Sequence, residues 1–136
     1  MAWVGKPPLV MVIDDEPSIT GLFTEILQAE GYATLTAATA EQGLQILDRG
    51  TIPNAVLLDL RMPGAGGLGF LLSLRAHPQR SQIPVAVVTA DTHLDDTTER
   101  AVHAMGAQLC FKPMNVEEVL SLVEQLIGPA PRLPGR

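Results

Sequence analysis

The sequence predicts an α/β fold in which a five-stranded parallel sheet is covered by helices on both faces, a doubly wound arrangement. Two observations predict it. Five short apolar runs alternate along the chain with five segments of helical pattern, and this alternation is typical of a parallel sheet covered by helices. The strongest runs are also apolar almost throughout, as expected for strands that are buried on both faces.

The expected strands are residues 9–13, 33–38, 54–60, 84–90 and 108–111. The run PVAVVTA at 84–90 is rich in β-branched residues, which favour strands, and LVMVI at 9–13 is continuously apolar. The run ATLTAA at 33–38 is weaker, and QLCF at 108–111 is short.

The expected helices are residues 17–30, 40–50, 68–77, 94–106 and 115–128. Pro17 suits the first position of a helix, and Gly31 and Gly50 stand where a helix ends. The apolar face of the first helix is expected to consist of Leu22, Phe23, Ile26 and Leu27.

Length and composition favour one folded domain. The chain has 136 residues, 46% of them hydrophobic and 18% charged, which suits a single core. We expect the domain to span 1–128 and the segment PAPRLPGR at 129–136, with its three prolines, to form a tail or linker stub.

Charge and hydropathy exclude several classes. The net charge of −6 disfavours direct binding of nucleic acid by this domain. No apolar run approaches the ~20 residues that span a bilayer, and the N-terminal residues lack the apolar core of a signal peptide. Cys110 is the only cysteine, which excludes an internal disulfide and weakly favours a reducing compartment. We therefore expect a cytoplasmic domain with no membrane partner.

Acidic side chains follow two of the expected strands. Asp14 and Asp15 come directly after the first strand, and Asp59 lies at the end of the third. Crossovers between parallel strands are right-handed in nearly all cases, and the flavodoxin-like order 2-1-3-4-5 makes the first and third strands neighbours, with ligands at the switch point between them. We therefore expect this order, with the three carboxylates converging at the C-terminal edge of the sheet.

Converging carboxylates need a cation or bound protons, since two charges ~4 Å apart repel by roughly 4 kcal/mol at an effective dielectric near 20. Mg²⁺ is suited to such a site because it keeps open positions for water and phosphate oxygens. Thr89 and Lys112 come from the ends of the fourth and fifth strands and reach the same edge. A metal, a hydroxyl and an ammonium around one carboxylate would stabilise a phosphoryl group, and the carboxylate itself can act as the nucleophile.

Four motifs, VIDDE, VLLDLRMPG, VVTA and FKP, occur in this order. Together they resemble the receiver domain of two-component response regulators, over residues 9 to about 127. The resemblance implies that Asp59 accepts a phosphoryl group from a sensor histidine kinase or a histidine phosphotransfer protein. It also implies that Thr89 donates its hydroxyl to that group and that Lys112 pairs with its charge. Self-phosphorylation and self-dephosphorylation, without turnover of a separate substrate, are the expected activities.

The resemblance also implies a Mg²⁺ site. Asp15, Asp59 and the backbone carbonyl of Arg61 would be direct ligands, and Asp14 would act through water. Gly66 stands where the family often has an acid, which predicts a looser loop after Asp59.

The fifth strand departs from the family pattern. The family usually has Tyr or Phe three residues before the lysine, where this chain has Leu109. The stretch before Lys112 is also one residue shorter than usual. Both differences put the family's hydroxyl–aromatic switch in doubt, although Phe111 could take this role after a shift in register.

Two other functions stay open on the sequence. A degenerate receiver could act as an interaction module without phosphorylation, as Leu109 would allow. A dinucleotide-binding fragment is suggested by GAGGLG at 64–69, with Asp91 as the ribose-binding acid. Against it, Asp59 to Pro63 separate the glycines from the strand end, and the remaining chain is too short for a substrate domain.

Simpler structural interpretations apply to other residues. The acids at 14–16 could cap the helix that begins at Pro17. Cys110 is expected to be a small core residue, and the three histidines have no metal-ligand spacing. Arg61 and Asp91 have opposite charge and follow Asp59 and Thr89 by two residues each, so neighbouring strand ends could bring them together.

Overall fold

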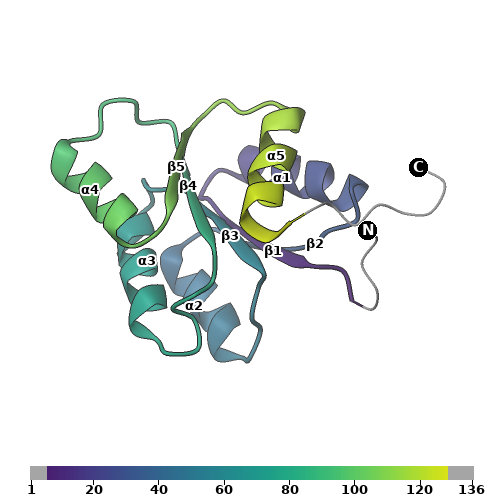
Figure 1. Ribbon diagram of the computed structural model, residues 1–136, viewed down its shortest axis with the longest axis horizontal. Helices are drawn as coiled ribbons and strands as arrows, with labels where there is room; N and C mark the ends of the chain where they lie inside the picture. The colour runs from purple at the N-terminus through teal and green to yellow at the C-terminus, as the bar shows by residue number, and fades with distance from the viewer. Residues whose placement is uncertain (1–5, 129–136) are drawn as a thin grey trace.

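The computed structural model describes residues 6–128 and contains one five-stranded parallel sheet, in the order β2-β1-β3-β4-β5 (Figure 1). The strands are β1 (Leu9–Ile13), β2 (Ala33–Ala37), β3 (Ala55–Leu58), β4 (Val85–Thr89) and β5 (Gln108–Phe111). The helices are α1 (Pro17–Ala29), α2 (Ala40–Asp48), α3 (Gly66–Ala76), α4 (Asp96–Ala104) and α5 (Val116–Ile127). The predicted fold class and strand order are confirmed.

Helices cover both faces of the sheet. Along β1, Met11 and Ile13 belong to one core cluster and Val10 and Val12 to the other, because successive side chains of a strand point to opposite faces. The first cluster is completed by α2, α3 and α4, and the second by α1 and α5, as Figure 1 shows. Burial on both faces explains why the central strands are apolar throughout.

Side-chain caps set three helix starts. Thr39 accepts a hydrogen bond from the backbone at the start of α2, and Asp95 does so for α4. Asn115 and Glu118 form a reciprocal capping box at the start of α5. Glu16, which precedes α1, makes no side-chain cap bond. Capping by that side chain therefore does not account for the acids before Pro17.

Several local predictions need correction. The helix α2 ends at Asp48, two residues before the expected 50, and α4 begins at Asp96, two residues after the expected 94. The helix α3 begins at Gly66, two residues before the expected 68. The strand β3 ends at Leu58, two residues before the expected 60, although the backbone N–H of Asp59 still donates to the carbonyl of Ile13 on β1. Leu22 is 45% exposed, since the buried stripe of α1 is centred on Phe23 and Leu27.

The predicted tail at 129–136 lies outside the described residues. Within residues 6–128, no helix is both long enough and apolar enough to cross a membrane.

Candidate functional site

The ends of β1 and β3 bring three acids together. Backbone bonds continue past both strands: the N–H of Asp14 donates to the carbonyl of Ala37 at 3.0 Å, and the N–H of Asp59 donates to that of Ile13 at 2.8 Å. One carboxylate oxygen each of Asp14, Asp15 and Asp59 lie within 4.8 Å of one another. Among residues 6–128, these acids alone form such a group of potential metal ligands, and no histidine takes part.

Two of the three clustered acids are buried. Asp59 is 6% exposed and Asp14 is 4% exposed, whereas Asp15 is exposed to solvent. Burial raises the pKa of Asp59, and the charge of Asp14 raises it further, against the lowering effect of Lys112. Both causes disfavour the ionised carboxylate, which a bound cation would stabilise.

Lys112 supplies the cation beside these acids. Its backbone N–H donates to the carbonyl of Thr89 at 2.8 Å, which sets its position past the end of β5. Its Nζ lies 2.6 Å from Oδ2 of Asp14 and 3.8 Å from Oδ1 of Asp59. The lysine therefore forms its closer ion pair with Asp14, an arrangement that sequence reasoning missed.

Thr89 ends β4 at the same edge of the sheet and is fully buried. Its Oγ1 accepts a hydrogen bond of 3.1 Å from the backbone N–H of Asp91. Because the oxygen is the acceptor, the hydroxyl hydrogen remains a potential donor.

The glycines after Asp59 have a packing role. Gly64 and Gly66 have φ of 76° and 67°, which is the left-handed region that favours glycine. A Cβ on Gly67 would lie 2.3 Å from the carbonyl oxygen of Asp59 and 2.7 Å from Cα of Leu60. The start of α3 therefore packs directly on the backbone of Asp59, which explains GAGGLG without a nucleotide.

The side chains of β5 alternate between the two faces of the sheet. Leu109 pairs with Val87 and packs, partly buried, against the core beneath α2, α3 and α4. Phe111 pairs with Thr89 in the ladder and is 44% exposed. The aromatic ring beside the end of β4 is thus that of Phe111, two residues from the position that the family pattern favours.

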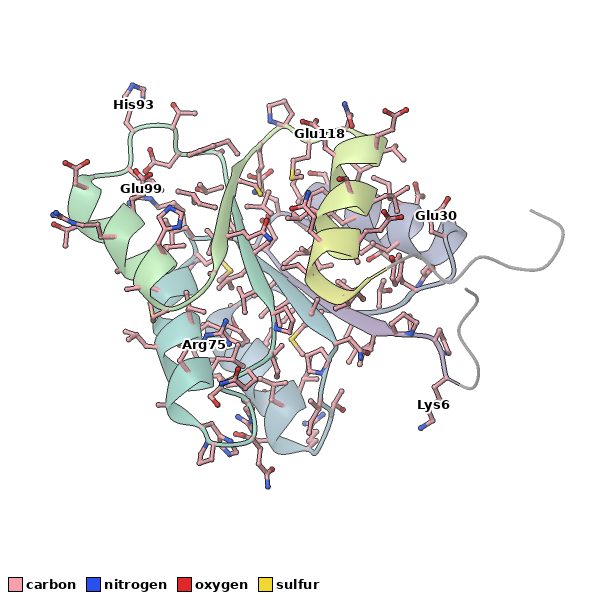
Figure 2. All side chains as sticks on the ribbon, in the orientation of Figure 1. Lys6, Glu30, Arg75, His93, Glu99 and Glu118 are labelled. Carbon is pink, nitrogen blue, oxygen red and sulfur yellow. The ribbon has the colours of Figure 1, made fainter. Side chains whose placement is uncertain are left out.

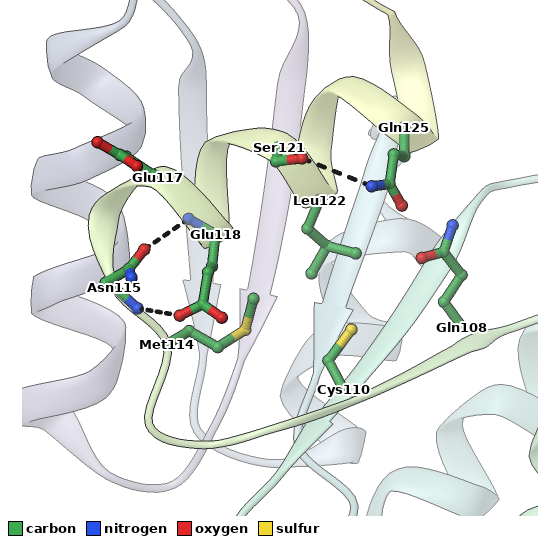
Figure 3. A pocket seen from close by; sticks show the side chains of 9 residues that line it. All are labelled: Gln108, Cys110, Met114, Asn115, Glu117, Glu118, Ser121, Leu122 and Gln125. Atoms are coloured by element: carbon green, nitrogen blue, oxygen red, sulfur yellow. Dashed lines mark hydrogen bonds between the residues drawn. The ribbon is translucent and has the colours of Figure 1, made fainter.

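A groove of about 410 Å³ runs between β5 and α5 (Figure 3). Cys110, Met114 and Leu122 contribute to its lining, and none of the clustered acids does. Cys110 packs against the core beneath α1 and α5, and burial raises the pKa of its thiol. The thiol is therefore kept protonated, as the predicted packing role requires.

The sequence of the chain also identifies its family. The profile of the family described as "Response regulator receiver domain" matches residues 10–124. The chain therefore belongs to the receiver domains of two-component response regulators. A receiver domain, and not a dinucleotide-binding fragment, is therefore the class of protein that the sequence defines.

Two curated relatives illustrate the range of this family. The chain is 33% identical over 124 residues to the DNA-binding transcriptional regulator NtrC of Escherichia coli (strain K12), a match that covers 88% of this chain and 25% of NtrC. It is 31% identical over 119 residues to sporulation initiation phosphotransferase F of Bacillus subtilis (strain 168), which covers 87% of this chain and 92% of the relative. The chain thus spans a quarter of one relative and nearly all of the other.

Solved structures agree with this assignment. Chemotaxis protein CheY4 of Vibrio cholerae matches with a TM-score of 0.80 and 26% identity, covering 88% of this chain and 98% of that one. Response regulator TrrA of Thermotoga maritima, in complex with Mg²⁺-BeF, matches with a TM-score of 0.75 and 30% identity over the same shares of the two chains.

Proposed function

We propose that this receiver domain accepts a phosphoryl group on Asp59 and changes conformation in response. The donor is a phosphohistidine on a sensor histidine kinase or a histidine phosphotransfer protein. The supporting observation is the juxtaposition of a buried Asp59 with two further acids and the ammonium of Lys112 at one edge of the sheet.

In this proposal, a carboxylate oxygen of Asp59 attacks the phosphorus of the phosphohistidine. The new P–O bond forms as the P–N bond breaks, and the electron pair stays on the imidazole nitrogen, which takes up a proton. Lys112, with its Nζ 3.8 Å from Asp59, is placed to meet the charge of the transferred group. The hydroxyl of Thr89 donates to a phosphoryl oxygen. The conformational change is a shift between two states that the phosphorylated residue favours differently.

A divalent cation fits the acid cluster. Three carboxylates with oxygens within 4.8 Å of one another are a hard donor set, and the charge of Asp14 adds to burial in raising the pKa of Asp59. Asp15, Asp59 and the backbone carbonyl of Arg61 would hold Mg²⁺ directly, with Asp14 acting through water. When bound, the ion would supply charge neutralisation for the phosphoryl oxygens.

Labelling with a small phosphodonor tests the acceptor. Incubation with acetyl phosphate and Mg²⁺ should add one phosphoryl group to the intact protein, as measured by mass spectrometry. Asp59→Asn should abolish the addition, and Asp48→Asn, which removes a carboxylate at the C-terminal end of α2, should leave it intact. Undiminished labelling of Asp59→Asn would show that another residue is the acceptor.

Thermal unfolding tests the metal site. Mg²⁺ should raise the melting temperature by mass action, with about 2.7 kcal/mol of stabilisation at 100 times the dissociation constant. Asp15→Asn should weaken Mg²⁺ binding, yet it should not destabilise the metal-free fold because it relieves repulsion. Glu16→Gln is the matched control, since it neutralises an adjacent exposed acid that lies outside the cluster. Equal Mg²⁺ affinity in wild type and Asp15→Asn would exclude direct ligation.

The alternative function is a phosphorylation-independent interaction module, which Leu109 favours because the usual aromatic residue is missing at that position. The two functions differ in one observable. A working receiver binds its partner with an affinity that depends on phosphorylation, whereas the degenerate module binds equally well with and without acetyl phosphate.

The remaining properties follow from this function. The domain corresponds to residues 1–128, acts in the cytoplasm, and catalyses only its own phosphorylation and dephosphorylation. Its net charge of −6 disfavours binding of nucleic acid by this domain, so any output on DNA would come from another domain or partner.

A further inference from the structure

The strand β2 has a single neighbour in the sheet. It pairs with β1 and forms one edge of the sheet (Figure 1). The N–H of Ala33 donates to the carbonyl of Pro8 at 2.9 Å, and the carbonyl of Ala37 accepts from the N–H of Asp14 at 3.0 Å. Because alternate residues of a parallel strand bond to opposite sides, the odd-numbered residues of β2 face β1.

The even-numbered residues of β2, Thr34 and Thr36, point their backbone groups away from the sheet. Within residues 6–128, none of their two N–H and two carbonyl groups has a hydrogen-bond partner. Just beyond the strand, the N–H of Ala38 donates to Oε1 of Gln42 at 2.8 Å. The open part of the edge is therefore short and is centred on the residue between the two threonines.

The surface beside this edge carries no charge. A groove of about 470 Å³ lies between α1 and β2, and all of its lining residues are uncharged. Thr20, Thr24 and Gln28 line it from α1, four residues apart, which places them on one stripe of the helix. Neither Glu25 nor Glu30 lines the groove, and Glu30 lies at the end of α1 in Figure 2.

The edge also lacks the features by which monomeric proteins prevent strand pairing. Such features are a lysine, a proline or a bulge on the edge strand. The sequence of β2, ATLTA, contains no charged residue and no proline, and its five pairs with β1 follow one another without a bulge. In a chain with a net charge of −6, a neutral surface is where two copies meet with the least repulsion.

We propose that β2 is a self-association edge, at which two copies of this chain pair their β2 strands antiparallel into one ten-stranded sheet. A two-fold axis at Leu35 places Thr34 of each copy opposite Thr36 of the other, and each such pair exchanges two N–H···O bonds. All outward groups of both threonines are then satisfied in both copies. The segment is thus its own complement, which favours a second copy over another strand. The pairing goes beyond the proposed function and does not require phosphorylation of Asp59.

Sedimentation equilibrium measures the association. Four hydrogen bonds at a short edge make a small interface, so the dimer is expected at protein concentrations of about 0.1–1 mM. Raising the ionic strength from about 0.01 M to about 0.15 M should strengthen dimerisation, because it screens the repulsion between two acidic chains.

A pair of lysine variants locates the interface. Thr36 is exposed, so Thr36→Lys should fold, and it places a charge on the edge. It should weaken dimerisation by at least about tenfold, although it lowers the net negative charge. Thr97→Lys makes the same change at an exposed position of α4 and should leave dimerisation no weaker than in wild type. Thermal unfolding confirms that both variants are folded.

Cysteine cross-linking tests the register. In a Cys110→Ala background, Leu35→Cys places one thiol of each copy at the axis, in a non-hydrogen-bonded pair with Cα atoms about 4.5 Å apart. That separation suits a disulfide, so mild oxidation should give a covalent dimer. Thr34→Cys in the same background should not, because residues 34 of the two copies are out of register and more than about 7 Å apart.

Each result supports or overturns the pairing. A wild-type protein that stays monomeric to about 1 mM would overturn it and would leave the edge to a strand of another protein. A Thr36→Lys dimer as stable as that of wild type, or an equal loss in Thr97→Lys, would show that association does not use β2. Equal cross-linking of Thr34→Cys and Leu35→Cys would overturn the antiparallel register. None of these results bears on Asp59 as the acceptor.

Discussion

Replacement of Gly67 by alanine tests how the acceptor is positioned. The added Cβ would lie 2.3 Å from the carbonyl oxygen of Asp59 and 2.7 Å from Cα of Leu60. Both are backbone atoms, so no flexible side chain can move aside. Such overpacking costs about 1–3 kcal/mol, whereas alanine in place of glycine in a helix gains roughly 0.5–1 kcal/mol. The clash with rigid backbone should prevail, with a net loss of up to about 2.5 kcal/mol.

Gly21 provides the matched control. It lies within α1, and a Cβ added there meets no atom within 4 Å. Gly21→Ala should therefore stabilise the protein by roughly 0.5–1 kcal/mol. Since 1 kcal/mol moves the melting temperature of a domain of this size by about 4 °C, calorimetry should resolve opposite shifts for the two variants.

The functional assay adds a second readout. At a temperature where both variants are folded, Gly67→Ala should slow labelling by acetyl phosphate because the backbone of Asp59 is displaced, whereas Gly21→Ala should label at the wild-type rate. If Gly67→Ala were as stable and as reactive as Gly21→Ala, the packing of α3 on Asp59 would not be what fixes the acceptor.

Further predictions concern single side chains. Asp59→Asn should stabilise the metal-free protein increasingly as the pH rises above 3.8, the ordinary pKa of an aspartate, because ionisation of Asp59 with its raised pKa costs folding free energy. Denaturation in EDTA at several pH values measures the difference in unfolding free energy between the variant and wild type. A difference that does not change with pH would contradict the prediction. Lys112→Met should destabilise the metal-free fold by about 3 kcal/mol, because it leaves buried carboxylates without their cation. The same variant should bind Mg²⁺ more tightly in a titration. Unchanged stability would refute the ion pairing of Lys112 with these carboxylates. Burial and nearby carboxylates raise the pKa of Tyr32, the only tyrosine, to about 12, so ultraviolet titration should show late ionisation and stability should fall as the pH rises above 10. A tyrosine that titrates near 10 in the folded protein would contradict its burial. Leu109→Ala should lower the free energy of unfolding by about 2 kcal/mol, the low end of the range for core leucines, because the side chain is only partly buried. Phosphorylation-dependent partner binding should survive. Selective loss of that binding response in a folded variant would show that Leu109 carries the signal.

Strand order and the meeting of the acids could be predicted because they depend on general rules. An apolar run that stops at Asp14 marks the end of a buried strand, and the topology of doubly wound sheets makes the first and third strands neighbours. The same adjacency indicated that Arg61 and Asp91 could come together, and the structure contains their ion pair.

Other features depend on local geometry that no sequence pattern specifies. The ammonium of Lys112 can reach either of two carboxylates, and only the side-chain conformations place it closer to Asp14 than to Asp59. The close approach that requires Gly67 depends on where α3 begins, and that start differs from the predicted one by two residues.

The exposure of Leu22 shows a further limit. A helical periodicity identifies the buried face, but the angle at which a helix rests on the sheet decides which residues at the margin of that face are covered. Leu22 is at the margin and is 45% exposed, whereas Phe23 is 3% exposed.

The position of the acyl phosphate decides whether Asp59 is the acceptor. The protein is labelled with acetyl phosphate in Mg²⁺ buffer, and borohydride reduces the phosphorylated carboxylate to the alcohol, which converts aspartate to homoserine. Peptide mass spectrometry then locates the converted residue. We expect conversion at Asp59 alone, and conversion at Asp14, at Asp15 or at no aspartate would contradict the proposed acceptor.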